Sequence, residues 1–170
     1  GEIWIVPDVE FDPNKEIVAQ GQTYFAIQTR RQELADAAKG AGVIEPMDYA
    51  IFQNHGYMGL YGGLKQEDIH RRKGLKKSQK ILDHMGSTEL AANLFRATQA
   101  EEKLRRDEVK GKDAANRTHR EVGAKVRQTI RELGGTMPEE LPVAESIQKI
   151  ETKERKRIGK AATPAKKKNA

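Results

Sequence analysis

Apolar residues recur every three or four positions in several separate stretches of this chain. That spacing places side chains on one face of an α-helix, whereas a half-buried β-strand alternates every two residues. Three long stretches follow the helical pattern, at residues 12–42, 87–109 and 113–135. The alternation in "EIWIV", residues 2–6, is a weak strand signal without an evident pairing partner. The pattern therefore predicts a small all-α domain.

The two later stretches are the best defined, and a short connection around Gly111 joins them. Short connections favour antiparallel neighbours, so the sequence predicts a helical hairpin here. The apolar stripe of the first hairpin helix comprises Leu90, Leu94, Ala97 and Leu104. The stripe of the second comprises Ala115, Val122, Val126, Ile130 and Leu133.

The first long stretch begins with Asp12 as a helix cap and Pro13 at the first helical position. Its stripe comprises Ile17, Val18, Gly21, Tyr24 and Phe25.

Two shorter helices are expected between these stretches. "MDYAIFQNHGYMGLYGG" predicts a helix from Asp48 that runs into a glycine-rich turn, because four glycines lie between positions 56 and 63. "KQEDIHRR" predicts a second short helix, closed by Gly74. Four or five helical segments are therefore expected in all.

Positive charge is concentrated at the C-terminus. The chain has a net charge of +6, yet residues 149–170 hold nine lysines or arginines and two glutamates, so the remainder is nearly neutral at −1. A terminal block of like charge is typical of a disordered interaction tail. The expected organisation is a remnant N-terminal segment (1–11), a helical domain (12–142) and a basic, largely disordered tail (143–170).

Two further basic elements lie within the helical domain. "HRRKGLKKSQK", residues 70–80, holds six lysines and arginines and no acid. In the last long stretch, four arginines fall within an arc of about 80° on a helical wheel, nearly opposite the apolar stripe. Guanidinium groups suit phosphate, so these elements favour a salt-dependent contact with a nucleic-acid backbone. The candidate contact residues are Arg71, Arg72, Lys73, Lys76, Lys77, Lys80, Arg117, Arg120, Arg127 and Arg131. The alternative is that both elements are ordinary solvated surface.

Tyr57 and Tyr61 lie in the glycine-rich stretch close to the basic run. Exposed aromatic rings beside lysines could stack on the bases of single-stranded DNA. For this reason single-stranded DNA is the favoured partner form. The alternative, which we favour for these two tyrosines, is that both rings pack the turn onto the core.

The sequence lacks the usual signatures of an enzyme. It has no cysteine and no phosphate-binding loop, and its four histidines belong to no H-E-x-x-H motif. We expect His119 in the core and His84, beside Asp83, at a helix cap. No apolar run approaches the roughly 20 residues that span a bilayer. These features predict a non-enzymatic protein without cofactor, metal or membrane partner, in the cytoplasm or associated with the nucleoid.

The chain closely resembles the bacterial DNA-damage-inducible protein D family in "IVAQGQTYFAIQTRRQELAD", "FQNHGYMGLYGG", "IHRRKGLKKSQKILDHMGSTELAANLFRATQAEEKLRRD" and "VRQTIRELGGTMPEELP". The resemblance extends over residues 12–142. Residues 75–133 are also similar, more faintly, to regions that accompany Bro-N-type phage antirepressors. The family resemblance implies an SOS-response protein that acts on DNA or on a RecA-type recombinase filament.

Two departures from the family accompany this resemblance. Family members carry a fuller N-terminal domain, and they continue after "RRQELAD" with a longer charged helical segment, where Asp36 here runs directly into "AAKGAG". We therefore expect a shortened or internally deleted relative. The functional prediction is a DNA-damage response protein that binds nucleic acid, modulates a recombinase filament, or both. The alternative is a protein–protein regulator or a structural subunit of a larger assembly, without direct DNA contact.

Overall fold

The computed structural model describes residues 13–162, which form helices and connecting loops. The elements are α1 (Pro13–Gly40), α2 (Pro46–Leu60), α3 (Gln66–Arg72), η1 (Ile81–His84), α4 (Ser87–Arg106), α5 (Lys112–Glu132), η2 (Pro138–Glu140) and α6 (Ile147–Ala162), of which η1 and η2 are short 3-10 helices. Within this range an isolated bridge between Met85 and Val143 is the only β-type pairing. The all-α prediction is confirmed. The predicted N-terminal remnant and its strand signal lie outside the described residues.

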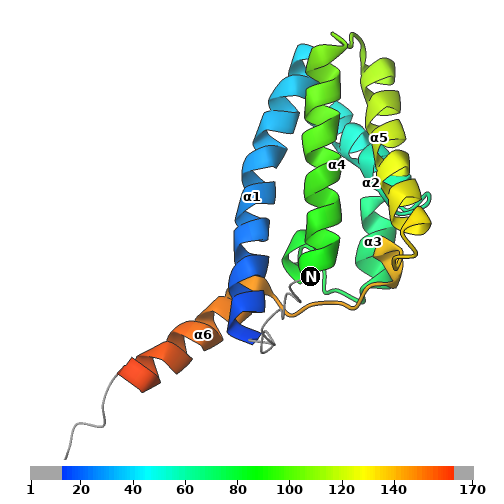
Figure 1. Ribbon diagram of the computed structural model, residues 1–170. Helices are drawn as coiled ribbons and strands as arrows, with labels where there is room; N and C mark the ends of the chain where they lie inside the picture. The colour runs from blue at the N-terminus through cyan, green and yellow to red at the C-terminus, as the bar shows by residue number, and fades with distance from the viewer. Residues whose placement is uncertain (1–12, 163–170) are drawn as a thin grey trace, which may run out of the picture.

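Four helices, α1, α2, α4 and α5, form an elongated bundle (Figure 1). α1 packs along α4, and α2 packs along α5. α4 and α5 run antiparallel through a loop that ends at Gly111, so the predicted hairpin is confirmed. Gly111 has a φ of 98°, a conformation that favours glycine. Its N–H donates a hydrogen bond to the carbonyl of Ala41 at 2.6 Å, which ties the hairpin loop to the connection between α1 and α2.

Two clusters of buried apolar residues make up the core. One includes Ile27, Leu60, Ile81, Leu90 and Val126, and the other includes Leu34, Phe52, Ala97, Leu104 and Val122. Two positions of the predicted stripes are instead solvent-facing, since Phe25 is 74% exposed and Leu133 is 80% exposed. α1 buries Ile27 and Leu34, and Phe25 lies about 200° around the helix from Ile27. Leu133 follows the last residue of α5 and is therefore beyond its buried face.

Three glycines let α2 and α5 approach closely. Gly56 and Gly59 lie inside α2, where the sequence predicted a turn, and they face α5. A Cβ atom on Gly59 would lie 2.2 Å from the carbonyl oxygen of Arg120, and one on Gly123 would lie 2.7 Å from the carbonyl oxygen of Gly56. The turn itself is made by the next two glycines, at positions 62 and 63, which have φ values of 66° and 102°.

Residues 137–146, here called the strap, cross the end of the bundle from α5 to α6 (Figure 1). α6 then forms a helix over part of the segment for which the sequence predicted disorder. Its charged residues are good helix formers, and pairs such as Glu154 and Arg157, 2.6 Å apart, support the helix locally. Residues 163–170 lie outside the described residues. No helix within residues 13–162 is long and apolar enough to cross a membrane.

Candidate nucleic-acid interface

The basic run continues from α3 into a loop of defined shape. Gly74 has a φ of 66° and ends the helical turn. The His70 ring nitrogen Nε2 lies 3.1 Å from the carbonyl oxygen of Lys76 and 2.9 Å from that of Gln79. The lysines of this loop, Lys76, Lys77 and Lys80, are exposed, and no carboxylate among the described residues forms an ion pair with them. This loop therefore presents three hydrated ammonium groups to solvent.

The two arginines at the end of α3 are exposed but paired. Arg71 lies 3.5 Å from Asp68, one turn earlier on the same helix. Arg72 donates hydrogen bonds to the strap, to the carbonyl oxygen of Glu139 at 2.8 Å and to the carboxylate of Glu140 at 3.0 Å. The strap therefore supplies carboxylate and carbonyl oxygens to a side chain that the sequence assigned to phosphate.

Lys73 is a core residue and not a contact residue. Its side chain is 6% exposed, and its ammonium lies 2.7 Å from the carboxylate of Glu89, which is 1% exposed. Burial raises the pKa of Glu89 above its ordinary value of 4.5, while hydrogen bonds from Lys73 and Tyr61 favour the charged form. The prediction that Lys73 contacts nucleic acid is corrected, because its charge is already committed inside the fold.

The four arginines of α5 that share one side of the helix, here called the arginine column, are Arg117, Arg120, Arg127 and Arg131, and they are of two kinds. Arg117, Arg120 and Arg131 are exposed, and no carboxylate whose side chain the structure describes forms an ion pair with them. Arg127 is half-buried and donates two hydrogen bonds to the Glu139 carboxylate, at 2.8 and 2.7 Å, and one to the carbonyl of Leu60 at 3.2 Å. The column is therefore not free of acid, since the strap places a carboxylate in it.

The two tyrosines are unavailable for stacking on bases. Tyr57 and Tyr61 are both buried, and the guanidinium carbon of Arg96 lies 5.1 Å from the Tyr57 ring centroid. The Tyr61 hydroxyl donates a hydrogen bond to Glu89 and accepts one from Asn93 at 3.0 Å. Burial and the Glu89 charge raise the pKa of Tyr61 well above its ordinary value. The stacking assignment is corrected, and the packing alternative is the one the structure shows.

A chain of buried polar side chains connects these groups to α5. Arg96 donates a hydrogen bond to Asn93 at 3.2 Å and another to His119 Nε2 at 2.6 Å. Because arginine is only a donor, Nε2 accepts and His119 Nδ1 donates to the Phe52 carbonyl at 2.8 Å. His119 is thus the hydrogen-bonded core histidine that the sequence predicted. Burial, and then the charge of Arg96, hold its pKa well below 6.5.

His84, the histidine that the sequence placed beside Asp83 at a helix cap, contacts the strap. His84 is buried, and its Nδ1 lies 3.0 Å from the carbonyl oxygen of Ala144 in the strap. Within residues 13–162, no group of three or more histidine, aspartate or glutamate side chains is arranged to hold a metal ion.

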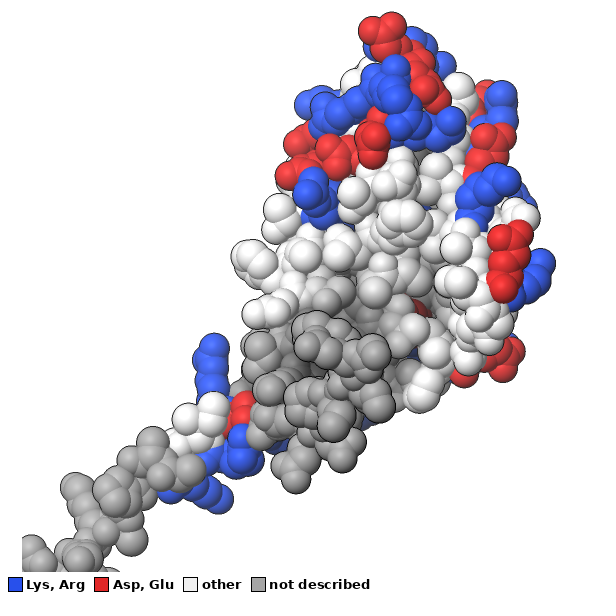
Figure 2. Space-filling model, viewed as in Figure 1, with Lys and Arg blue, Asp and Glu red and all other residues white. Residues whose placement is uncertain are grey.

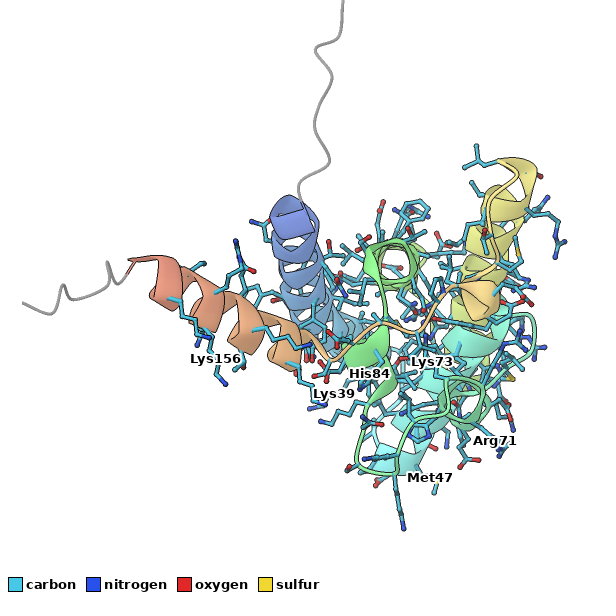
Figure 3. All side chains as sticks on the ribbon, turned by 90° about the horizontal axis from the view of Figure 1, so that it is seen from below. Lys39, Met47, Arg71, Lys73, His84 and Lys156 are labelled. Carbon is cyan, nitrogen blue, oxygen red and sulfur yellow. The ribbon has the colours of Figure 1, made fainter. Side chains whose placement is uncertain are left out.

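Charge is mixed over the face that Figure 2 shows. Acidic and basic side chains alternate at the upper end of the molecule and along α5, and the middle of this face is neutral. In Figure 3, Arg71 lies at the edge of the bundle, while Lys156 extends from α6 on the other side of the view. On the face that Figure 2 shows, the basic side chains are therefore spread over separate elements and do not form one uniform patch.

Sequence reasoning missed two elements of this surface. The strap carries Glu139 and Glu140, which reach Arg127 and Arg72 only after the chain has turned back along the bundle. α6 arranges its lysines on one side, and the sequence contained that signal as a spacing of four, three and four residues from Lys149 to Lys160. The signal was lost because the segment was expected to be disordered.

Two comparisons match this chain to known proteins. Residues 23–150 match a family described as the DinD C-terminal domain. The chain is also similar to "DNA damage-inducible protein D" of Escherichia coli strain K12, with 61% identity over 170 residues that cover 82% of this chain and 62% of the relative. The chain therefore spans less than two thirds of that relative's length. No solved structure gives a significant match.

Proposed function

The chain belongs to the DinD C-terminal domain family, and on that premise we propose that it is a non-enzymatic component of the response to DNA damage. The resemblance predicted from the sequence is confirmed by both matches, while the fainter one to phage antirepressor regions stays a prediction. The printed name of the relative supports a role in DNA damage. In this proposal the protein binds nucleic acid, modulates a RecA-type recombinase filament, or both.

One observation supports nucleic-acid binding above the others. Six of the ten candidate contact residues are exposed and, among the described residues, unpaired with carboxylates: Lys76, Lys77, Lys80, Arg117, Arg120 and Arg131. Arg72 and Arg127 both contact Glu139, so the end of α3 and the last part of α5 both reach the strap. Exposed cations in this arrangement suit a phosphate backbone, whose binding releases counterions.

Fluorescence anisotropy with labelled single- and double-stranded oligonucleotides at several salt concentrations tests this proposal. The variants K76Q/K77Q/K80Q and R117Q/R120Q/R131Q each remove three unpaired charges. K39Q/K110Q/K125Q is the matched control. It removes three exposed lysines that belong neither to the basic run at residues 70–80 nor to the four arginines of α5. We expect salt-dependent binding, a loss of about tenfold or more in at least one site variant, and little change in the control. Absence of binding at low salt, or equal losses in all three variants, would contradict the proposal.

The recombinase alternative needs a separate measurement. The same exposed arginines of α5 could face an acidic protein surface, since guanidinium also pairs well with carboxylate. Reversal of Arg120 and Arg131 to glutamate should then abolish capture by a recombinase filament while leaving the affinity for bare oligonucleotides unchanged. Arg127 is unsuitable for this test, because its charge is paired with Glu139 inside the fold. If the reversal lowers the affinity for bare DNA and for recombinase-coated DNA equally, direct contact with nucleic acid is favoured.

A further inference from the structure

α6 carries a column of four lysines along one side. Lys149, Lys153, Lys156 and Lys160 are all exposed and fall within an arc of about 60° on the helical wheel. Lys153 lies 3.0 Å from Glu145, and no described carboxylate forms an ion pair with the other three. Glu154, the described acid of α6, lies more than 90° away and pairs with Arg157. Figure 3 shows Lys156 extending from α6 away from the bundle.

The strap fixes the base of α6 to the body. The backbone N–H of Ala144 donates to the carbonyl of His84 at 3.0 Å, and the His84 ring binds the carbonyl of Ala144. The Ser146 hydroxyl donates to Asp83 at 2.7 Å. α6 then packs on α1 and on η1, while its far end projects from the bundle (Figure 1). Because three hydrogen bonds and the packing on α1 and η1 hold this end, the column has a defined position relative to the loop that precedes η1.

We infer that the lysine column of α6 is a phosphate-binding element, and that with Lys80 it holds a nucleic-acid strand. This inference rests on the proposed function and assigns the site a further element. Lys80 directly precedes η1, and α6 packs on η1, so the basic loop and α6 both meet this short helix. The column is about 16 Å long, which matches roughly five nucleotides of a duplex strand at 3.4 Å each. Its lysines act as point charges, so we expect contact without sequence preference.

Nucleic acid suits the column better than a membrane surface does. A helix that lies in a lipid interface usually combines a basic face with tryptophan, phenylalanine or leucine on the other face. α6 contains none of these three residue types. Its large apolar residues are three isoleucines, of which Ile158 is exposed.

The variant K149Q/K156Q/K160Q tests the inference, with K39Q/K110Q/K125Q as the control of equal net charge. Lys153 is left in place because it pairs with Glu145. Glutamine retains a good helix propensity, and circular dichroism with thermal unfolding checks that both variants keep the fold. The readout is anisotropy of the full chain with single- and double-stranded oligonucleotides between low and physiological salt.

We expect the column variant to bind about tenfold or more weakly than the control, with the slope of log affinity against log salt reduced by about two to three. If the wild type binds and the two variants behave alike, the inference fails while the proposed function stands. If the wild type binds no oligonucleotide, the proposed function fails and the inference fails with it. The last measurement is binding of the wild type and both variants to vesicles that contain phosphatidylserine. Loss of vesicle binding in the column variant, with oligonucleotide binding equal to the control, would overturn the inference in favour of a lipid surface.

Discussion

Arg127 and Glu139 form a bidentate ion pair that joins the last part of α5 to the strap. The guanidinium donates to both carboxylate oxygens, and both side chains are mostly buried, at 17% and 13% exposed. The hydrogen bonds that Arg127 donates to Glu139, and then the charge of Glu139, raise the pKa of Arg127. Burial alone would raise the pKa of Glu139, but the hydrogen bonds and charge of Arg127 outweigh it and lower that pKa below 4.5. The pair therefore fastens the strap, and through it α6, to α5.

Replacement of Glu139 by glutamine should destabilise the fold by about 1–3 kcal/mol near neutral pH, because a buried guanidinium loses its charged partner. The folded-state pKa of Glu139 is lowered, so its contribution is present above pH 4.5 and is lost as pH falls below that value. Urea unfolding of the wild type and E139Q between pH 3 and pH 7 checks this. The two midpoints should converge in acid. A constant difference across the range would show that the pair does not carry the effect.

Lys73 should matter for stability and not for DNA affinity. K73M leaves the Glu89 carboxylate buried without its cation, which costs about 3 kcal/mol or more. Glu89 would then hold its proton to a higher pH, so the variant should lose stability as pH rises through that pKa. The double variant K73M/E89Q should recover most of the stability, because no unpaired charge remains. Its oligonucleotide affinity should equal that of the wild type, whereas a loss like that of K76Q/K77Q/K80Q would return Lys73 to the contact surface.

The helices could be predicted because the periodicity that defines them is local. The stripe through Val122 and Val126 and the short connection at Gly111 determined the antiparallel hairpin without reference to the rest of the chain. In α1 the same reasoning selected Phe25 over Ile27, because a helix with apolar residues on two sides does not reveal which side meets its neighbours.

The candidate site was harder to predict, because it depends on residues distant in sequence. A helical wheel shows only the residues of its own helix, so Arg127 seemed to belong to an acid-free column until the strap placed Glu139 against it. Arg72 meets Glu140 across 68 positions of sequence. Lys73 looked like its basic neighbours, and only the position of Glu89 on α4 distinguishes it. Lys76, Lys77 and Lys80 keep their predicted exposure, while their binding of nucleic acid stays a prediction.

The contact between α2 and α5 should not tolerate a methyl group at its glycines. In G59A the new Cβ would lie 2.2 Å from the Arg120 carbonyl oxygen, a backbone atom that cannot move aside without separating the helices. We expect a loss of several kcal/mol or failure to fold, as in other cases of overpacking.

G40A is the control, since no atom lies within 4 Å of its added Cβ and its φ is not positive. It should be neutral or stabilise by up to about 1 kcal/mol. Similar melting temperatures for both variants would contradict close packing of these helices.

His119 should give the protein a pH dependence on the acidic side of neutrality. Its folded-state pKa is well below 6.5 because burial and Arg96 oppose a second positive charge. The unfolded chain therefore binds a proton that the folded chain does not, so stability is complete above about pH 6.5 and falls as the pH is lowered. In H119Q the amide oxygen can still accept from Arg96, but the titration is removed, so the decline between pH 6.5 and pH 5 should be smaller than in the wild type. H55Q is the control, because His55 is only partly buried and its pKa is less strongly lowered. The measurement is the urea midpoint of the wild type, H119Q and H55Q across this pH range. An unchanged decline in H119Q would mean that the buried chain from Arg96 to Phe52 does not hold a neutral imidazole.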